Sequence, residues 1–352
     1  MNIIKAGYEL VPDTSDKLGI VKKIERVARN CYKSEELITD TSCIKMVQSL
    51  IKRGHYAMLE FGSFVFEIDT TSYYDTIALV NHLQDLVEQY KYEAFKSYLR
   101  FSDDNSKYII SGNVRAWLEF LEACMKYVGK IPVFLKIYFD AMSKLYNESD
   151  VTILFKNYID APEGFYIYEQ AMVKVKRITP FEFKESLTIR ERLIHQDLTV
   201  KFTVDRGIAN ELERHRECSF AQESTRYCNY SKGKFGNEIT VIKPCYWEED
   251  DEVFTEWKLS CEEAEKSYRI LLNEGASPQQ ARSVLPLAIK ADTYVNANIR
   301  EWIHIFELRA LGVTGKPHPQ MEEVMIPLAK ELVTGILSDF TCIESMNKVL
   351  TL

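Results

Sequence analysis

The sequence has few of the features that mark membrane, secreted or zinc-binding proteins. It contains no run of the roughly 18 to 20 apolar residues that a membrane span needs, and residues 1–17 lack the basic-then-apolar order of a signal peptide. Its eight cysteines are scattered and include no CxxC pair, which disfavours a zinc site and a compact disulfide framework. We therefore expect a cytoplasmic protein with free thiols and no membrane segment.

Positive charge is also scarce. The formal net charge is -8, whereas a broad nucleic-acid surface needs a field positive enough to displace counterions from phosphate. We therefore expect no nucleic-acid partner, and any phosphate site must be local. The acidic run at 248–252 (EEDDE) lacks the spaced oxygen ligands and the glycine of a calcium loop. It is predicted to be a solvated loop, and no metal site is expected.

The chain does have enough apolar residues for a sizeable core. It comprises 352 residues, of which 46% are hydrophobic, so one large or two fused compact units are expected. Residues 277–280 (SPQQ) have the serine, proline and glutamine of a helix start with a capping box. Apolar spacing predicts helices at 20–34, 42–53, 206–215, 257–273, 296–311 and 321–337, and strands at 61–69, 198–205 and 237–244.

These elements indicate an α+β fold, with a twisted, mainly antiparallel sheet flanked by helices. Residues 1–71 and 196–352 are predicted to form the main domain, and 72–195 a large, mostly helical insertion. The segment SGNVRAWLEF (111–120) repeats the Asn, β-branched residue, Arg, any, Trp order of NANIREWIHI (296–305). This echo suggests that the insertion contains a degenerate copy of the main domain.

The most unusual segment is RHRECSFAQESTRY, at 214–227. It gathers three arginines, a histidine, two serines and a glutamine in an otherwise acidic chain. Arginine presents a fixed fork of donors that suits phosphate and paired carbonyl groups, so a small anionic ligand is one natural partner. A surface cluster paired with Glu211, Glu213, Glu217 and Glu223 is the alternative that composition alone favours.

Four segments together resemble the flavin-dependent thymidylate synthases, the thymidylate synthase complementing protein family. Arg214-His215-Arg216, seven residues and Ser224 match the family signature, and RGHYAMLEF (53–61) resembles its N-terminal Gly-His segment. ARSVLPL (281–287) and NIREWIHIFELRA (298–310) resemble two further segments in the correct order and spacing. The resemblance implies a transferase, an FAD-dependent methyltransferase that converts dUMP to dTMP with methylenetetrahydrofolate as carbon donor and NADPH as reductant.

The resemblance also implies roles for individual residues. Arg309 is the expected catalytic residue, because a permanent cation beside the uracil imide stabilises the negative charge that develops when carbon 5 is methylated. Residues expected to bind dUMP are Glu211, Leu212, Glu213, Arg214, Gln222, Glu223, Ser224, Thr225, Arg226, Arg282 and Arg309. Residues expected to bind FAD are His55, Ala57, Arg214, His215, Arg216, Gln222, Asn298, Ile299, Arg300 and His304.

The resemblance further implies a homotetramer whose sites lie between subunits. At 100° per residue, Asn298 and Arg309 share one helical face and Arg300 and His304 point away, so one helix is expected to serve two surfaces.

The chain departs from the family pattern at two places. Ala57 stands where Ser or Thr is usual and Phe61 where a second histidine often follows, which weakens the N-terminal FAD contact. In the echoed segment, Glu119 and Cys124 replace the equivalents of His304 and Arg309, so no second active site is expected there. The alternative to an enzyme is a catalytically silent nucleotide- or flavin-binding assembly protein of the same fold.

Overall fold

The computed structural model describes residues 1–70, 81, 83–85, 88–89, 99–103, 107–164, 173–231 and 237–352. The chain forms two compact units. Unit 1 comprises Met1–Val11, Ala28–Glu35 and Leu198–Leu352, and unit 2 comprises Pro12–Val27 and Glu36–Asp197. This grouping places residues 36–70, which were predicted to belong to the main domain, in the same unit as the predicted insertion. The predicted boundary at 71–72 lies outside the described residues, and the division into a main domain and an insertion stays a prediction.

Unit 1 is built on a four-stranded sheet in the order β10-β12-β9-β2. Its strands are β2 (Gly7–Val11), β9 (Asp197–Asp205), β10 (Ser219–Gln222) and β12 (Lys290–Asn298). The pairs β2–β9 and β10–β12 are antiparallel. A second, two-stranded sheet pairs β1 (Asn2–Ile4) with β11 (Thr240–Ile242) in parallel. Because β12 lies between β10 and β9, it is buried along most of its length.

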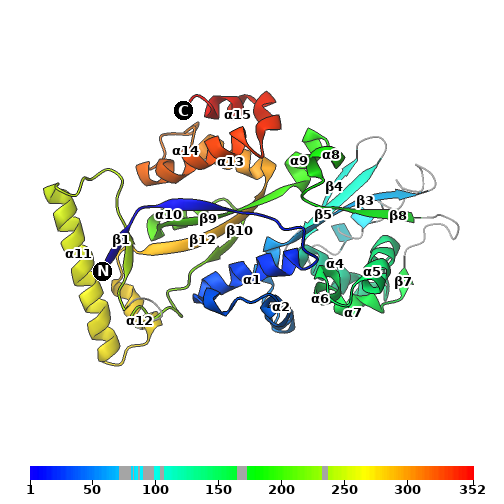
Figure 1. Cartoon of the computed structure of the whole chain (residues 1–352), viewed down its shortest axis with the longest axis horizontal. Helices are drawn as coiled ribbons and strands as arrows, with labels where there is room; N and C mark the ends of the chain where they lie inside the picture. The colour runs from blue at the N-terminus through cyan, green and yellow to red at the C-terminus, as the bar shows by residue number, and fades with distance from the viewer. Residues whose placement is uncertain are drawn as a thin grey trace. The chain divides into compact units, whose positions relative to one another are not determined.

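Helices cover this sheet and place the candidate site at its end. In Figure 1, α13 (Ile299–Arg309), α14 (Pro319–Thr334) and α15 (Glu344–Val349) lie on one side of the sheet. Fully buried Trp302 and Phe306 of α13 join Phe202 of β9 in the core. The remaining elements of unit 1 are α10 (Arg206–Leu212), α11 (Glu252–Asn273), α12 (Pro278–Ala281), η4 (Arg282–Val284) and η5 (Ser338–Cys342).

Unit 2 contains its own four-stranded antiparallel sheet, in the order β4-β5-β3-β8. Its strands are β3 (Ser63–Thr70), β4 (Arg100–Asp103), β5 (Tyr108–Asn113) and β8 (Val173–Ile178). Phe66, Trp117 and Phe134 pack edge to face in its core. The other elements are α2 (Ser42–Lys52), η2 (Tyr56–Phe61), α4 (Val114–Tyr127), β6 (Ile131–Pro132), α5 (Val133–Leu145), α6 (Asp150–Leu154), α7 (Lys156–Ile159), β7 (Glu163–Gly164), α8 (Phe183–Ser186) and α9 (Ile189–His195). Helix α1 (Gly19–Tyr32) begins in unit 2 and ends in unit 1, and η1 is Glu35–Leu37.

The predicted α+β class with mainly antiparallel sheets is confirmed, although the described residues form two such sheets rather than one. The helices predicted at 20–34, 42–53 and 257–273 and the strands at 61–69 and 198–205 are present within a few residues. The capping box of Ser277 and Gln280 is also confirmed. No helix among the described residues is long and apolar enough to cross a membrane.

The prediction of a helix from 296 onward was wrong at its start. Residues 296–298 end strand β12, and the helix begins only at Ile299. Strand β12 was missed because six of its nine residues are Lys, Ala, Asp or Asn, which are depleted in strands. The predicted helix 206–215 likewise ends early, at Leu212, so Arg214, His215 and Arg216 lie in the turn that follows α10.

Candidate functional site

Arg309, the last residue of α13, is held in one orientation by α10 and the turn after it. Its Nη1 donates to Glu211 Oε2 at 3.2 Å, and its Nη2 donates to the main-chain oxygen of Glu211 at 3.4 Å. Its Nε donates to His215 Nε2 at 3.2 Å. These contacts use three of the five N–H groups of a guanidinium. The predicted residues Glu211, His215 and Arg309 are therefore brought together, and Arg309 is fixed before any ligand arrives.

The bond from Arg309 also defines the protonation state of His215. Burial, together with the charges of Arg309 and His304, lowers the pKa of His215 to about 4. The imidazole is therefore neutral at pH 7, and its Nε2 must be the acceptor, which places the ring proton on Nδ1. That nitrogen lies 3.8 Å from Glu301 Oε1. Because His215 is neutral, its ring can accept this hydrogen bond and hold Arg309 in place.

A cavity of about 680 Å³ surrounds this arrangement. Four cationic side chains and three carboxylates line it, which concentrates positive charge locally in an acidic protein. The lining residues are Glu211, Arg214, His215, Arg216, Glu217, Glu301, His304, Leu308, Arg309, Thr314, Gly315, Lys316, Pro317 and His318. Its size lies within the range of small-molecule sites. The cavity can therefore accept an anionic ligand of cofactor or nucleotide size.

The expectation that α13 serves two surfaces was wrong for His304. His304 and Arg309 line the same cavity, together with Glu301. The ring of His304 meets that of His215 edge to face, with centroids 6.3 Å apart. Asn298 is the N-cap of α13, because its side chain accepts from the N–H of Glu301. Asn298 therefore lies just before the helix, and it does not line the cavity that contains Arg309.

A second group of predicted residues lies in the loop after β10. Ser224 Oγ accepts from the N–H of Arg226 at 3.3 Å, and the N–H of Ser224 donates to Cys31 O at 3.2 Å. Arg282 reaches the same loop, since its Nη1 donates to Thr225 Oγ1 at 3.3 Å. Arg282 and residues 222–226 do not line the cavity around Arg309. Within unit 1 the predicted dUMP residues thus form two groups.

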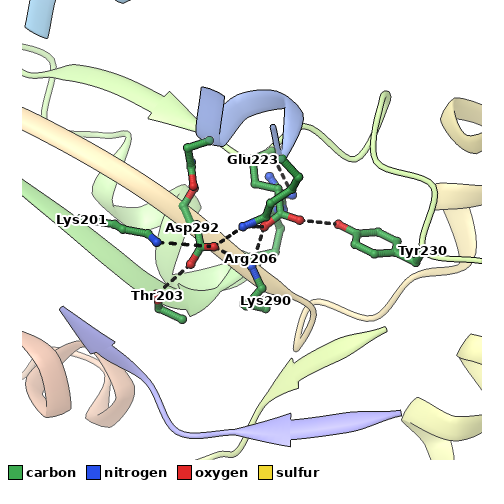
Figure 2. Close-up of polar contacts among 9 residues, drawn as sticks. Lys201, Thr203, Arg206, Glu223, Tyr230, Lys290 and Asp292 are labelled. Carbon is green, nitrogen blue, oxygen red and sulfur yellow. Dashed lines mark hydrogen bonds and ion pairs between the residues drawn. The ribbon is translucent and has the colours of Figure 1, made fainter. Parts of the chain in front are cut away.

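Among the described residues, one buried amide nitrogen next to this loop lacks a hydrogen-bond acceptor, which a ligand or a bound water could supply. Gln222 Nε2 is buried and has no hydrogen-bond partner within the part of the chain that the structure describes. A buried amide without an acceptor costs free energy, which a ligand atom could recover. By contrast, Glu223 is buried, and both of its carboxylate oxygens accept from other side chains, as Figure 2 shows for Tyr230 and Lys290.

Several predicted residues are placed differently. Leu212 and Ile299 are buried in the core, so their side chains do not face the cavity. Glu213 caps the end of α10, and Arg300 is 64% exposed beside Glu217. His55 and Ala57 belong to unit 2, at the start of η2, whereas the other predicted FAD residues belong to unit 1.

The chemistry of Cys218 does not favour a nucleophile. Burial raises the pKa of its thiol, and the nearby carboxylates of Glu301 and Glu217 raise it further. A thiol in this setting stays protonated at neutral pH and is a poor nucleophile. Across the described ranges, no group of three or more His, Cys, Asp or Glu side chains is placed to hold a metal ion.

Sequence reasoning missed two parts of the site. The loop 314–318 lines the cavity and contributes Lys316. Lys33, Lys290 and Asp292 form a charged cluster beside the 222–226 loop. The signal that could have found the cluster is the pair Lys290 and Asp292 inside the apolar segment 284–295, because buried charges occur mainly where they are paired.

Comparison with known proteins confirms the resemblance seen in the motifs. Residues 190–333 match the family model described as "Thymidylate synthase complementing protein". This range contains the 214–226 signature, Arg282 and the 298–309 segment, but not the 53–61 segment.

Relatives named flavin-dependent thymidylate synthase match part of the chain. The protein of Pyrococcus abyssi is 32% identical over 119 residues, which cover 33% of this chain and 48% of that protein. The protein of Synechocystis is 30% identical over 133 residues, or 36% and 62% of the two chains. The protein of Haloarcula marismortui is 28% identical over 204 residues, or 50% and 82%. The chain thus spans about half the length of the first of these relatives.

Among solved structures, the UMP/dUMP methylase PolB from Streptomyces cacaoi bound with 5-Br UMP matches over 95% of this chain and 91% of its own. The identity is 12% and the TM-score 0.37. The same methylase bound with 5-Br dUMP matches with 13% identity and an equal TM-score. At this TM-score the likeness supports no conclusion.

Proposed function

We propose that this chain is a flavin-dependent thymidylate synthase that methylates dUMP to dTMP. In this proposal methylenetetrahydrofolate donates the carbon, and NADPH supplies the reducing equivalents through FAD. The observation that carries the proposal is Arg309, held by Glu211 and by a neutral His215 in a cavity with local positive charge. The curated relatives that match the same segments carry this name.

The chain's own residues account for two requirements of the reaction. Methylation at carbon 5 of uracil needs electron density in the ring, and Arg309 can stabilise negative charge on an imide oxygen without a proton transfer. Its fixed orientation means that little reorganisation is needed when that charge develops. Bound FAD would supply hydride transfer, and Arg214, Arg216, His215 and His304 offer donors that suit its diphosphate.

We further propose a cytoplasmic homotetramer whose sites are shared between subunits. The separation of the predicted nucleotide residues into two groups supports this, because Arg282 and residues 222–226 do not line the cavity that contains Arg309. Mixing an Arg309→Ala variant with an Arg226→Ala variant tests it. If each site takes residues from two chains, the mixture regains part of the activity that both variants lack. An inactive mixture of co-assembled variants would contradict shared sites.

The alternative, a silent flavin-binding assembly protein, predicts FAD binding without turnover. The proposal therefore requires that purified protein binds FAD and forms dTMP from dUMP, methylenetetrahydrofolate and NADPH. Protein that binds FAD yet forms no dTMP would support the alternative.

Removing Arg309 tests its role directly. Arg309→Ala should lower the rate of dTMP formation by about 10² to 10³, the usual effect of losing one preorganised electrostatic partner. FAD should stay bound, as measured by its absorbance after desalting. Lys266→Ala, on the exposed face of α11, is the matched control and should keep full activity. Unchanged turnover in Arg309→Ala would remove this residue from the site.

A further inference from the structure

A cluster of charged side chains lies beside the 222–226 loop, and we call it the Asp292 cluster. It comprises Lys33, Lys201, Glu223, Lys290 and Asp292, of which Figure 2 labels the last four. Asp292 Oδ2 contacts Lys290 Nζ at 2.8 Å, Lys201 Nζ at 3.9 Å and Lys33 Nζ. Glu223 Oε2 contacts Lys290 Nζ at 2.6 Å and Lys33 Nζ at 3.2 Å. Both carboxylates are thus bridged by the same two lysines.

The cluster also fixes the main chain of the loop. The N–H of Glu223 donates to Asp292 O at 2.9 Å, and Asn30 Nδ2 donates to that same oxygen at 3.0 Å. Arg206 Nη2 donates to Glu223 O at 3.4 Å. Asp292 Oδ1 accepts from Thr203 Oγ1 at 2.7 Å. The start of the loop is therefore tied directly to β12 and to the first residue of α10, and through Asp292 to β9 and α1.

The side chain of Glu223 is closed off from solvent and already has three partners. Its Oε1 accepts from Tyr230 Oη at 3.2 Å and its Oε2 from the two lysines, and the side chain is 1% exposed. The next residues differ, because Ser224 and Thr225 are half-buried and Arg226 is exposed. Ligand contact therefore falls to residues 224–226, and Glu223 faces inward as their support.

The backbone at Lys33 shows that this lysine is placed at a conformational cost. Lys33 has a φ of 48°, in the left-handed region that favours glycine. It lies just after α1, where its N–H bonds to Asn30 O and that of Ser34 to Arg29 O, the pattern of a Schellman motif. Glycine would fit this position without strain, but only a long cationic side chain can reach both carboxylates.

We propose that the Asp292 cluster positions the nucleotide-binding loop, with Lys33 and Lys290 acting through Glu223 and Asp292 to aim residues 224–226 at the phosphate of the substrate. This inference rests on the proposed function. It replaces the role of Glu223 as a nucleotide ligand with a positioning role. The charges support it: Lys290, Lys33 and Lys201 outweigh the effect of burial, which alone would raise the pKa of Asp292, and hold that pKa well below its usual value. The cluster is thus ionised at neutral pH and, with three cations to two anions, favours an anion nearby.

A double-mutant cycle tests the proposal. Lys33→Met and Glu223→Gln should each raise the Kd for dUMP by about 10- to 100-fold, because each removes one charge from the buried cluster, weakens the bridging ion pairs and frees the loop. FAD binding should be unchanged. The double variant should bind dUMP no more weakly than the single variant with the higher Kd, since both changes disrupt the same cluster. Lys33→Arg should retain most of the affinity.

The matched control is the exposed pair of Glu263 and Lys266 on α11, where Lys266→Met and Glu263→Gln should leave the Kd unchanged. Purely additive effects of Lys33→Met and Glu223→Gln would show that Glu223 contacts the nucleotide directly and would overturn the proposal. An unchanged Kd in folded Lys33→Met protein would overturn it as well.

Amide hydrogen exchange gives a readout that does not depend on the proposed function. In Lys33→Met, exchange of a peptide covering 219–231 should rise at least about tenfold, while peptides from α13 and α14 stay protected. Unchanged exchange in 219–231 would overturn the positioning role. Wild-type protein that does not bind dUMP would instead contradict the proposed function, and the exchange experiment would still decide how the loop is held.

Discussion

At the scale of single residues, the neutral state of His215 makes a prediction about pH. Its folded-state pKa of about 4 lies below the ordinary value of 6.5. Between these values the unfolded chain binds a proton that the folded chain does not, so this group costs stability as the pH falls from about 6.5 toward 4. Protonation would also remove the acceptor for Arg309 Nε.

We therefore expect the free energy of unfolding of the wild type to fall more between pH 7 and pH 5 than that of His215→Gln. Glutamine does not titrate, and every other group is common to both proteins. Chemical denaturation at the two pH values measures the difference. Equal losses in the two proteins would show that His215 titrates near its ordinary value in the fold.

Cys218 and Ser224 allow a second prediction about mechanism. The other route to thymidylate uses a cysteine thiolate that bonds to the uracil ring, but the raised pKa of Cys218 opposes thiolate formation. Ser224 Oγ already accepts from the N–H of Arg226 within its loop. Cys218→Ala should keep most activity, and Ser224→Ala should mainly raise the KM for dUMP. Denaturing mass spectrometry after turnover with 5-fluoro-dUMP should show no protein adduct, and an adduct mapped to either residue would contradict this mechanism.

At the scale of elements, helices and their caps could be predicted from the sequence, whereas the pairing of strands in the sheets could not. Helix α1 and the Ser277 capping box were read correctly because apolar spacing and caps are properties of short segments. Strand β2 pairs with β9, nearly two hundred residues away, and no local pattern carries that information. Strand β10 was not predicted, because its four residues lie inside the polar signature segment 214–227.

The same distinction holds for the candidate site. The motif resemblance identified Glu211, His215 and Arg309, which the structure brings together. It assigned Glu223 to the nucleotide because the motif gives no direction for a side chain. Lys33 comes from the end of α1 and Asp292 from β12, so their meeting depends on the fold of unit 1 and not on any spacing in the sequence.

The N-cap of α13 makes a prediction at this scale. Asn298 ends β12 and its side chain caps the helix that carries His304 and Arg309. Asn298→Ala should lower the free energy of unfolding by about 1 kcal/mol, whereas Asn298→Asp should stay near the wild type because aspartate caps equally well. Equilibrium denaturation measures both. An alanine variant as stable as the wild type would show that the cap contributes nothing here.

At the scale of the whole molecule, the two units have matching parts. Asn113 caps α4 with φ and ψ of -71° and 164°, and Asn298 caps α13 with -74° and 166°. Trp117 Nε1 donates to the oxygen of the second residue of β3, and Trp302 Nε1 donates to that of the second residue of β9. Each helix follows an inner strand of a four-stranded antiparallel sheet. These parallels support the proposal that the chain contains a degenerate repeat.

The two copies differ in what surrounds the equivalent arginines. Arg300 in unit 1 is 64% exposed and 3.9 Å from Glu217. Arg115 in unit 2 is 16% exposed, with its Nε 2.9 Å from Glu119 Oε1 and its Nη1 against Glu60. Cys124, at the position equivalent to Arg309, is buried. In unit 2, Arg115 therefore stabilises the fold, whereas the equivalent Arg300 in unit 1 is available to a ligand.

This difference predicts opposite effects for two matched variants. Arg115→Ala should lower the free energy of unfolding by about 1 to 3 kcal/mol, because it removes the charge-assisted hydrogen bond to the buried carboxylate of Glu119. It should leave dUMP-dependent flavin oxidation intact. Arg300→Ala should hardly change stability, since exposed ion pairs contribute little, but should weaken FAD binding. Denaturation curves and FAD titration on both variants measure the contrast. If Arg115→Ala lost dUMP-dependent oxidation while its fold and oligomeric state were preserved, unit 2 would take part in catalysis, and the copy could not be regarded as purely structural.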